Sequence, residues 1–378
     1  MTRPARVGCN LLWLVPGAVG GSEEATVALL REIAKQKPDD MHYRVYALDA
    51  FGATYPDVAE LFDTRLVPLE GRLKPLRVGA ENTWLASDTR KSELDLVHHM
   101  NAVLPVVRRA PGIVTVHDLQ PFDMPHNFHP VKRAYVHATV PRSVRKAALV
   151  LTPSEFVRQS IIDRFGVPSD RVRTTWWGFE PPSSDVTVAE VQARYGLSPR
   201  WFVMNAVTWP HKNHATLVRA FATVAAKQHD VTLVLTGGAA QEEELLVDLI
   251  ARLGLRDRVR RTGRIPRKDV LAIVRGAVAL TFPSRYEGFG LPVVEAMSMG
   301  TPVLAADATA LPEIVGEAGR LLDPDDPDAW SAAMLDLLAD GDERARLADA
   351  GRLRAQTFSW SLTAAKTLEA YRDVLSAT

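Results

Sequence analysis

The sequence predicts an α/β protein with two Rossmann-like, doubly wound domains that face each other across a cleft. Three observations lead to this prediction. The chain has 378 residues, which suits two domains of ordinary size. Short apolar runs alternate with amphipathic helical patterns along nearly the whole chain. Most of these runs are apolar on both faces, as is typical of parallel strands covered by helices.

The first domain is expected over residues 1–182. Its first buried strand is predicted at Val7–Leu14, followed by a glycine loop and a helix that Ser22 caps, with Glu23 and Glu24 in its first turn. The apolar N-terminal stretch also imitates a secretory signal, but we favour the strand. The further strands are expected in "RVYALDA", "LDLVHHM", "GIVTVHDL", "ALVLTPS" and "VRTTWW".

A break in the periodicity, "GFEPPSSDVTVAEV", separates the two domains because its prolines, serines and aspartates interrupt the apolar pattern. The second domain is expected over residues 190–357. Its strands are predicted in "WFVMNAV", "VTLVLTGG", "VRRTGRI", "VALTFPS" and "PVLAAD". The last segment, residues 358–378, predicts a helix that begins after Phe358.

The bulk composition excludes several classes of protein. Hydrophobic residues make up 47% and charged residues 24%, so we expect a packed core. Lys+Arg and Asp+Glu both number 45, which argues against a nucleic-acid partner. The single cysteine, Cys9, excludes an intrachain disulfide and fits a reducing, cytoplasmic location. The sequence contains no run of 18 apolar residues, so we expect no membrane-spanning helix.

The segment "FPSRYEGFGLPVVEAMSMGTPVL" predicts a strand end, a loop and a helix. Pro292 suits the first helical turn, and Gly300 ends the helix. Backbone N–H groups at the start of such a helix suit a phosphate. The residues expected to hold a nucleotide-sugar diphosphate there are Gly288, Phe289, Gly290 and Leu291.

Two glutamates flank this phosphate site, and we expect them to act at its two ends. Glu295 lies one turn inside the helix, where its carboxylate can accept hydrogen bonds from a ribose diol. Glu287 lies in the loop on the other side, within reach of a sugar hydroxyl. The segment therefore predicts a site for a nucleotide sugar.

The pattern E-G-F-G-L-P-x-x-E-A-M-x-x-G-x-P-V closely resembles the signature of retaining GT-B glycosyltransferases of family 4. The stretch "TWPHKNHATLVRAF" is similar to bacterial mannosyltransferases of that family. The resemblance spans "GAVGGSE" to "FSWSLTAAKTLEAY", so it covers essentially the whole chain. It implies the GT-B fold, in which the C-terminal helix, residues 358–378, crosses back to the first domain.

The same resemblance implies a reaction. A hexose moves from a nucleoside-diphosphate sugar to a hydroxyl of a glycan, glycolipid or small molecule, with retention and with the diphosphate as base. We expect no metal and no other cofactor. GDP-mannose is the favoured donor, while UDP-glucose, UDP-N-acetylglucosamine and dTDP-sugars remain open.

Individual residues match the family positions. Gly20 and Gly21 match the glycine loop near the diphosphate and donor sugar, His117 the histidine that contacts that sugar, and Lys212 the lysine that neutralises the leaving diphosphate. Each position also has a purely structural alternative. The two glycines would form a strand-to-helix turn, the histidine would be hydrogen-bonded at a strand end, and the lysine would lie on the surface. We interpret His117, Lys212 and Glu287 as the catalytic residues.

Three further positions match the nucleotide side of the family's site. Gly238 resembles a glycine edge near the nucleotide, with an ordinary strand-ending turn as the alternative. Arg264 and Ile265 lie in the segment whose backbone holds the base. The chain departs from the common pattern at Ala206, where many relatives carry an arginine, so Arg264 or backbone groups would have to replace that cation.

The segment 130–150 carries basic side chains and no acid. It predicts either peripheral contact with the inner membrane surface or a solvated helix face. Alternatives to a glycosyltransferase are a sugar-nucleotide epimerase on the same scaffold, an inert nucleotide-binding subunit and an NAD-dependent oxidoreductase. The oxidoreductase alternative rests on "GAVGGSE" and Asp49, but the glycine spacing in "GAVGGSE" is wrong for a dinucleotide site. The sequence predicts neither the acceptor's identity nor the oligomeric state.

Overall fold

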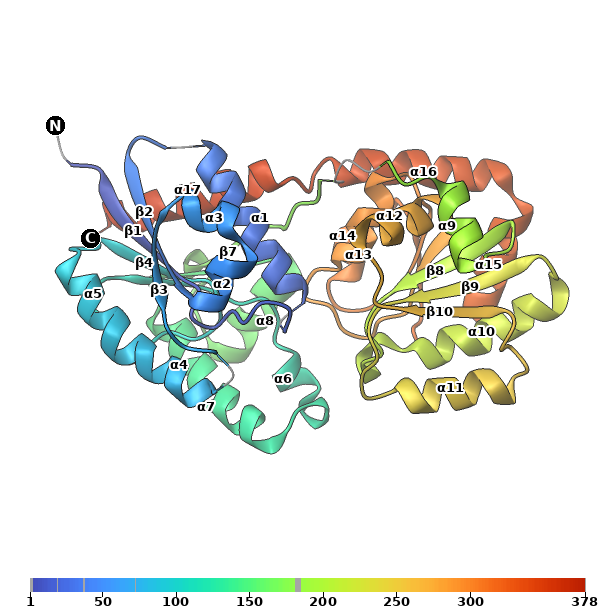
Figure 1. The fold of residues 1–378 in the computed structure, drawn as a ribbon, viewed down its shortest axis with the longest axis horizontal. Coiled ribbons are helices and arrows are strands. Elements are labelled where there is room, and N and C mark those ends of the chain that lie inside the picture. Colours follow the sequence, from blue (N-terminus) through green and yellow to red (C-terminus); the bar gives the residue numbers. More distant parts are fainter. Residues whose placement is uncertain (1–2, 19, 37, 72, 181–184, 378) are drawn as a thin grey trace. The chain divides into compact units, whose positions relative to one another are not determined.

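The structure is a computed structural model that describes residues 3–18, 20–36, 38–71, 73–180 and 185–377. The chain divides into two compact units, residues 1–178 with 360–378, and residues 179–359 (Figure 1). The domain boundary expected at residue 182 lies outside the described residues. The C-terminal helix α17 belongs to the first unit.

The first unit contains a seven-stranded parallel sheet in the order β3-β2-β1-β4-β5-β6-β7. The chain reverses its direction of travel across the sheet between β1 and β4, which is where ligands bind in open α/β sheets. The strands are β1 Ala5–Asn10, β2 Met41–Leu48, β3 Asp63–Val67, β4 Leu96–His99, β5 Gly112–Thr115, β6 Leu149–Thr152 and β7 Val172–Thr174.

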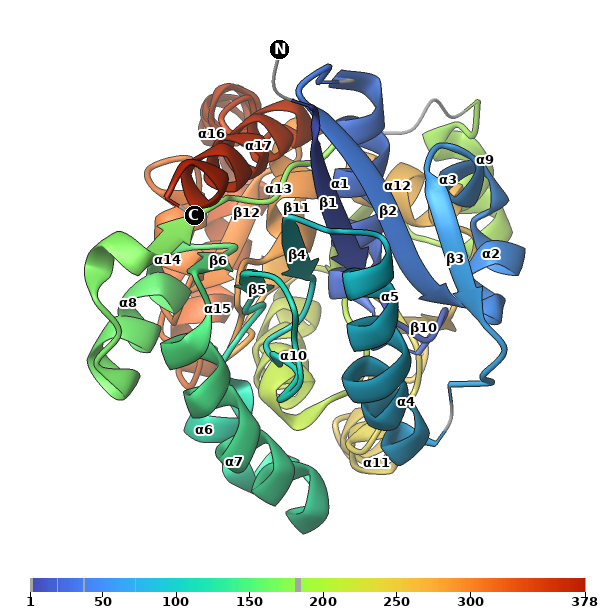
Figure 2. The same cartoon turned by 90° about the vertical axis from the view of Figure 1, so that its left-hand side faces the viewer.

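Helices cover both faces of this sheet, and α4, a π-helical turn and α5 follow one another without a break (Figure 2). The helical elements are α1 Gly21–Gln36, α2 Asp49–Thr54, α3 Pro56–Glu60, α4 Lys74–Ala80, η1 Glu81–Leu85, α5 Ala86–Lys91, α6 Gln120–Asp123, η2 Pro125–Asn127, α7 Pro130–Lys146, α8 Glu155–Phe165, η3 Ser169–Arg171 and α17 Trp360–Ser376.

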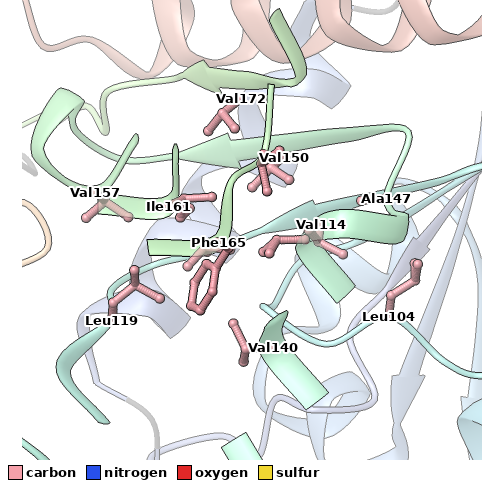
Figure 3. Close-up of a cluster of buried hydrophobic side chains, with 13 residues drawn as sticks. Leu104, Val114, Leu119, Val140, Ala147, Val150, Val157, Ile161, Phe165 and Val172 are labelled. Atoms are coloured by element: carbon pink, nitrogen blue, oxygen red, sulfur yellow. The ribbon is translucent and has the colours of Figure 1, made fainter. Parts of the chain in front are cut away.

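Alternate residues of the central strands enter different cores. Val114 and Val150 point to the face that α7 and α8 cover, where they pack around Phe165 (Figure 3). Ile113 and Leu149 belong to the opposite core, together with side chains of α1 and α17. This alternation is the two-residue period of a strand that is buried on both faces.

Helix α17 is bound into the first unit by polar as well as apolar contacts. The Tyr371 hydroxyl lies 2.7 Å from His98 Nδ1. Thr363 Oγ1 donates a hydrogen bond to the carbonyl of Trp176 at 2.6 Å. Trp360, at the first position of the helix, is buried.

The second unit contains a six-stranded parallel sheet in the order β10-β9-β8-β11-β12-β13. The helices α9 and α12 lie over one face of it and α10 and α11 over the other (Figure 1). The strands are β8 Arg200–Asn205, β9 Val231–Thr236, β10 Val259–Gly263, β11 Ala279–Phe282, β12 Val303–Ala306 and β13 Arg320–Leu322. The helical elements are α9 Val188–Tyr195, η4 Pro210–Lys212, α10 His214–Lys227, α11 Glu243–Arg252, α12 Arg267–Gly276, α13 Leu291–Ser298, α14 Leu311–Val315, α15 Pro327–Ala339 and α16 Gly341–Ala355.

The two parallel-sheet α/β domains confirm the predicted fold class. The first strand is shorter than predicted, because it ends at Asn10 and not at Leu14. The amide of Leu12 donates to Asn10 Oδ1 and that of Leu14 to the carbonyl of Leu11, so this apolar stretch turns. The prediction of Ser22 as a cap is also wrong, because the helix starts at Gly21 and Gly20 accepts its first backbone hydrogen bonds.

No helix in the described part of the chain has both the length and the apolar character needed to span a bilayer.

Candidate active site

The loop between β11 and α13 presents the signature glutamates of the second unit. It is attached to the η4 turn, because the amide of Arg285 donates to the carbonyl of His211 at 2.8 Å. Helix α13 begins at Leu291 with Pro292 in its first turn, and Gly300 closes the following turn with a φ of 72°, as predicted. The N-terminus of α13 and the η4 turn are thus fixed on either side of this loop.

Lys212 and Glu287 form an ion pair in this loop. The Nζ atom of Lys212 lies 2.5 Å from Oε1 of Glu287, and the two side chains are only 18% and 11% exposed. The lysine ends the η4 turn and the glutamate follows β11. Two residues that the sequence placed 75 positions apart therefore share one small region of low exposure.

Two residues with positive φ lie next to this ion pair or contact it. Asn213, directly after Lys212, has a φ of 61°, and Thr309 has a φ of 52°. Thr309 Oγ1 accepts a hydrogen bond from the amide of Glu287 at 3.0 Å. A left-handed conformation at a β-branched residue costs about 1–3 kcal/mol, and such strain is concentrated at functional positions.

Glu295 is held by Arg267 on α12. The Arg267 guanidinium contacts both carboxylate oxygens of Glu295, with Nη1 at 3.1 Å from Oε2. The Glu295 side chain is 3% exposed, while that of Arg267 is 38% exposed. The bidentate arginine fixes the orientation of the Glu295 carboxylate.

Phe289 and Gly290, just before α13, offer a ligand their backbone groups. Phe289 is buried and its ring packs edge-on against Phe358, with centroids 5.6 Å apart. Gly290 has a φ of 105°, and a Cβ there would lie 2.7 Å from a methyl of Leu311. Both features fix the backbone and direct side-chain atoms away from the helix N-terminus.

The ends of β8, β9 and β10 form a second backbone cluster. The amide of Gly237 donates to the carbonyl of Gly263, and the amide of Thr208 donates to Gly238. A Cβ at Gly237 would lie 2.2 Å from the carbonyl oxygen of Ala206, so glycine is required there. A Cβ at Gly238 would lie 2.8 Å from Nε of Arg264, which places this guanidinium beside the loop that carries Ala206.

Arg264 and Ile265 lie in the turn between β10 and α12, where Arg264 is exposed and Ile265 is half-buried. Gly238 and Arg264 are therefore neighbours, as are Lys212 and Glu287. Gly288, Phe289, Gly290 and Leu291 connect Glu287 to the helix that carries Glu295.

In the first unit, the glycine loop after β1 is organised by Glu23. Its carboxylate accepts one bifurcated hydrogen bond from the amide of Gly17, at 2.9 and 3.0 Å, and one from the Tyr55 hydroxyl at 2.7 Å. Gly20 has a φ of 78°, whereas Gly21 is the first residue of α1. No described atom lies within 4 Å of a Cβ built at either glycine, so internal packing does not require glycine at position 21.

His117 follows β5 and lies between the rings of Trp13 and Trp177, with centroid distances of 5.5 and 5.6 Å. Its Nε2 donates to the carbonyl of Met100 at 3.1 Å. Its Nδ1 is buried and has no hydrogen-bond partner among the described residues. Burial lowers the pKa of His117 to about 4, so the ring is neutral at pH 7 and Nδ1 is a hydrogen-bond acceptor.

Sequence reasoning missed the partners of these residues. Arg267 lies in the segment "RRTGRIPRKDV", but its position in the sequence does not predict that it pairs with Glu295. Thr309 and the two tryptophans around His117 carry no motif at all. A cluster of three or more His, Cys, Asp or Glu side chains able to hold a metal ion is absent from the described ranges.

Residues 19–180 match Glycosyltransferase Family 4, and residues 197–354 match Glycosyl transferases group 1. The O-antigen chain mannosyltransferase B of Escherichia coli is 34% identical over 283 residues, which cover 73% of this chain and 74% of that protein. The chain is a family 4 GT-B glycosyltransferase. This membership decides against the epimerase and oxidoreductase alternatives.

Other members of the family show how far the likeness extends. The glycosyltransferase is 42% identical over 240 residues to the MMP alpha-(1->4)-mannosyltransferase of Mycolicibacterium hassiacum, covering 62% of this chain and 56% of that protein. The crystal structure of HepE from Anabaena in complex with UDP-glucose shares the fold, with a TM-score of 0.75 at 21% identity, over 97% of this chain and 99% of that one.

Proposed function

We propose that this glycosyltransferase moves a hexose from a nucleoside-diphosphate sugar to an acceptor hydroxyl, with retention of configuration and without a metal ion. GDP-mannose is the favoured donor. The observation that carries the proposal is the partly buried Lys212–Glu287 ion pair beside the N-terminus of α13.

The ion pair is suited to exchange its partner for a diphosphate. In the free protein, Glu287 compensates the charge of Lys212. A diphosphate beside the amides at the start of α13 brings a stronger anion to the lysine. Glu287 can then accept a hydrogen bond from the donor sugar, so that the lysine and the helix N-terminus stabilise the charge that develops on the leaving group.

The remaining residues complete the proposed donor site. Arg267 keeps the Glu295 carboxylate oriented, and this carboxylate accepts hydrogen bonds from the hydroxyls of the ribose. Arg264 supplies the second cation that Ala206 cannot, from its position beside Gly238. The free Nδ1 of neutral His117 accepts a hydroxyl of the sugar, and exposed Gly20 and Gly21 let the diphosphate approach the backbone.

The names of the relatives support mannose, since two of them are mannosyltransferases. A solved neighbour binds UDP-glucose, which makes that donor the chief competitor. The test is a hydrolysis screen without acceptor, using GDP-mannose, UDP-glucose, UDP-N-acetylglucosamine and dTDP-glucose at equal concentration. We expect release of GDP above the other diphosphates, and preferential release of UDP would contradict the donor assignment.

Metal independence and retention need separate tests. The chelator-treated enzyme should keep its rate, because Lys212 and the α13 N-terminus neutralise the diphosphate in this mechanism. A loss that Mg²⁺ or Mn²⁺ restores would contradict it. The one-bond C1–H1 coupling at the anomeric centre of the first product formed, measured by NMR, should match the α configuration of GDP-mannose.

A further inference from the structure

The first unit contains an open cavity of about 1010 Å³ that the donor site does not use. It lies between the segment after β1, the helix α4 and the first half of α7. Trp13, Arg77 and Val78 line it on one side, and Lys132, Tyr135 and Val136 line it on the other.

Three cations line this cavity, Lys74, Arg77 and Lys132, together with the carboxyl groups of Glu81 and Asp118. Lys74 Nζ lies 3.6 Å from the centre of the Tyr135 ring, and Lys132 Nζ lies 4.7 Å from that of Phe128. Arg77 Nη1 donates to the carbonyl of Trp13 at 2.5 Å, whereas its buried Nε has no partner among the described residues. Within the described ranges, none of the three cations takes part in an ion pair.

The three cations are close enough for their charges to affect one another. Partial burial, together with the neighbouring charges of Lys132 and Arg77, lowers the pKa of Lys74 to about 8. The nearby Glu81 is buried and accepts a hydrogen bond from Asn10 Nδ2 at 2.9 Å. Burial raises the pKa of Glu81 to about 7, so this carboxyl offsets little positive charge below that pH.

Much of the remaining wall is apolar, but Asn101, Asp118 and His129 also belong to it. The exposed apolar side chains at the starts of the flanking helices α4 and α7 are called its rim here. Val103, Leu119 and Phe122 belong to its wall. Leu73, Leu76 and Val131, at the starts of α4 and α7, are 65%, 53% and 71% exposed. Large exposed apolar side chains beside a set of cations suit a ligand that is itself amphiphilic.

Among the basic side chains of residues 130–150, Lys132 is the one that lines this cavity. Arg142 donates to the carbonyl of Leu104 at 2.9 Å, and Arg145 donates to that of Phe165 at 3.0 Å. These two guanidiniums cap backbone groups of the protein itself, while Lys132 lines the cavity. Lys132 is therefore available to an anion in the cavity, whereas Arg142 and Arg145 are engaged by the protein's own backbone.

We propose that this cavity binds the acceptor substrate, and that the acceptor carries a phosphate group next to an apolar portion. Lys74, Arg77 and Lys132 hold the phosphate, and the apolar wall and rim receive the remainder. The inference rests on the proposed function, because it assigns the acceptor class of the same reaction. Phosphate fits better than a carboxylate, because three separate cations can each reach one of its oxygens.

Octyl phosphate is the probe that tests this assignment. Inorganic phosphate tests the phosphate group without an apolar portion, and octyl glucoside tests the octyl group without a phosphate. Binding is measured by titration calorimetry on the full chain. We expect octyl phosphate to bind at least about tenfold more tightly than either of the others. Equal binding of inorganic phosphate would overturn the apolar part, and equal binding of octyl glucoside would overturn the phosphate part.

The variants Lys74→Gln and Lys132→Gln should each weaken octyl phosphate binding about 10- to 100-fold, because each removes a charged hydrogen-bond partner. Lys146→Gln is the matched control, since Lys146 lies exposed at the far end of α7 and does not line the cavity. The proposal is overturned if Lys146→Gln weakens binding as much as Lys132→Gln does.

Donor hydrolysis without acceptor separates this inference from the proposed function. The two cavity variants should release diphosphate from the donor at the wild-type rate while their KM for a phosphate-bearing acceptor rises. An enzyme that hydrolyses the donor but does not bind octyl phosphate would refute the acceptor cavity alone. An enzyme that binds octyl phosphate but hydrolyses none of the tested donors would refute the proposed function alone.

Discussion

The charged side chains of the two units are prepared for ligands in opposite ways. In the second unit, each signature glutamate already has a cation, in the pairs Lys212–Glu287 and Arg267–Glu295. In the first unit, Lys74, Arg77 and Lys132 surround a cavity and have no ion-pair partner among the described residues. A paired site selects ligands that can exchange a partner, whereas an unpaired set requires an anion from outside.

This difference determines how each unit should respond to single substitutions. Removing one member of a partly buried ion pair leaves the other uncompensated, so the second unit should respond sharply to single substitutions. The cations of the first unit are relieved of mutual repulsion when one of them is removed, so the fold there should tolerate substitution well. The following predictions test the paired charges of the second unit against the buried carboxyl and the glycine loop of the first.

The largest effect is expected at Lys212. Lys212→Ala should slow sugar transfer by about 100- to 1000-fold, because a preorganised charge is lost from the departing diphosphate. The measurement is kcat for transfer at saturating donor. Lys227→Ala, on the exposed end of α10, is the matched control and should keep the wild-type rate. A normal rate in Lys212→Ala would move the leaving-group site to Arg264.

A pH effect is expected from Glu81 in the first unit. The pKa of Glu81 is raised to about 7 by burial, against 4.5 for the free group, so the folded protein retains a proton that the unfolded chain releases. Stability should therefore fall as pH rises through that window. Wild type should lose about 3 kcal/mol relative to Glu81→Gln between pH 4.5 and 8.

The measurement for Glu81 is urea unfolding of both proteins at pH 4.5 and pH 8. Taking the difference between wild type and variant removes the contribution of the buried histidines, which is the same in both. Glu60→Gln, on the exposed end of α3, should show no such difference. A constant gap between wild type and Glu81→Gln across this range would contradict the raised pKa.

The two signature glutamates should differ in their effect on nucleotide binding. Glu295→Gln should weaken the binding of a nucleoside diphosphate by about 1.5–3 kcal/mol, because the ribose loses a charged acceptor. Glu287→Ala should mainly lower turnover and leave the affinity for the free diphosphate nearly unchanged. Calorimetric titration with GDP checks both, and equal losses of affinity would remove the distinction between their roles.

The smallest effect is expected at Gly21. Alanine suits the first helical turn, and no described atom lies near the new methyl, so Gly21→Ala should keep the wild-type Tm. If the donor diphosphate approaches this backbone, kcat/KM should still fall about tenfold. Gly341→Ala, at the first position of α16, is the control. Equal kcat/KM in both variants would place the diphosphate elsewhere.

Local sequence determined much of this protein. The alternation of apolar runs and helical patterns was sufficient to predict two parallel-sheet domains. Local rules also placed Pro292 and Gly300 at the two ends of α13, because capping depends on residues within one turn. The short strands β3 and β13 escaped prediction, since "DTRLV" and "RLL" at the sheet edges are partly exposed and lack a continuous apolar run.

Tertiary structure alone decided which charges meet. Lys212 and Glu287 are 75 residues apart and Arg267 and Glu295 are 28 apart, and no helical or strand period relates them. The same holds for the cavity, where Lys74 on α4 comes to lie over Tyr135 on α7. Sequence patterns report which face of an element is apolar, but the contacts between elements depend on how whole sheets and helices pack, and that is set by the complete chain.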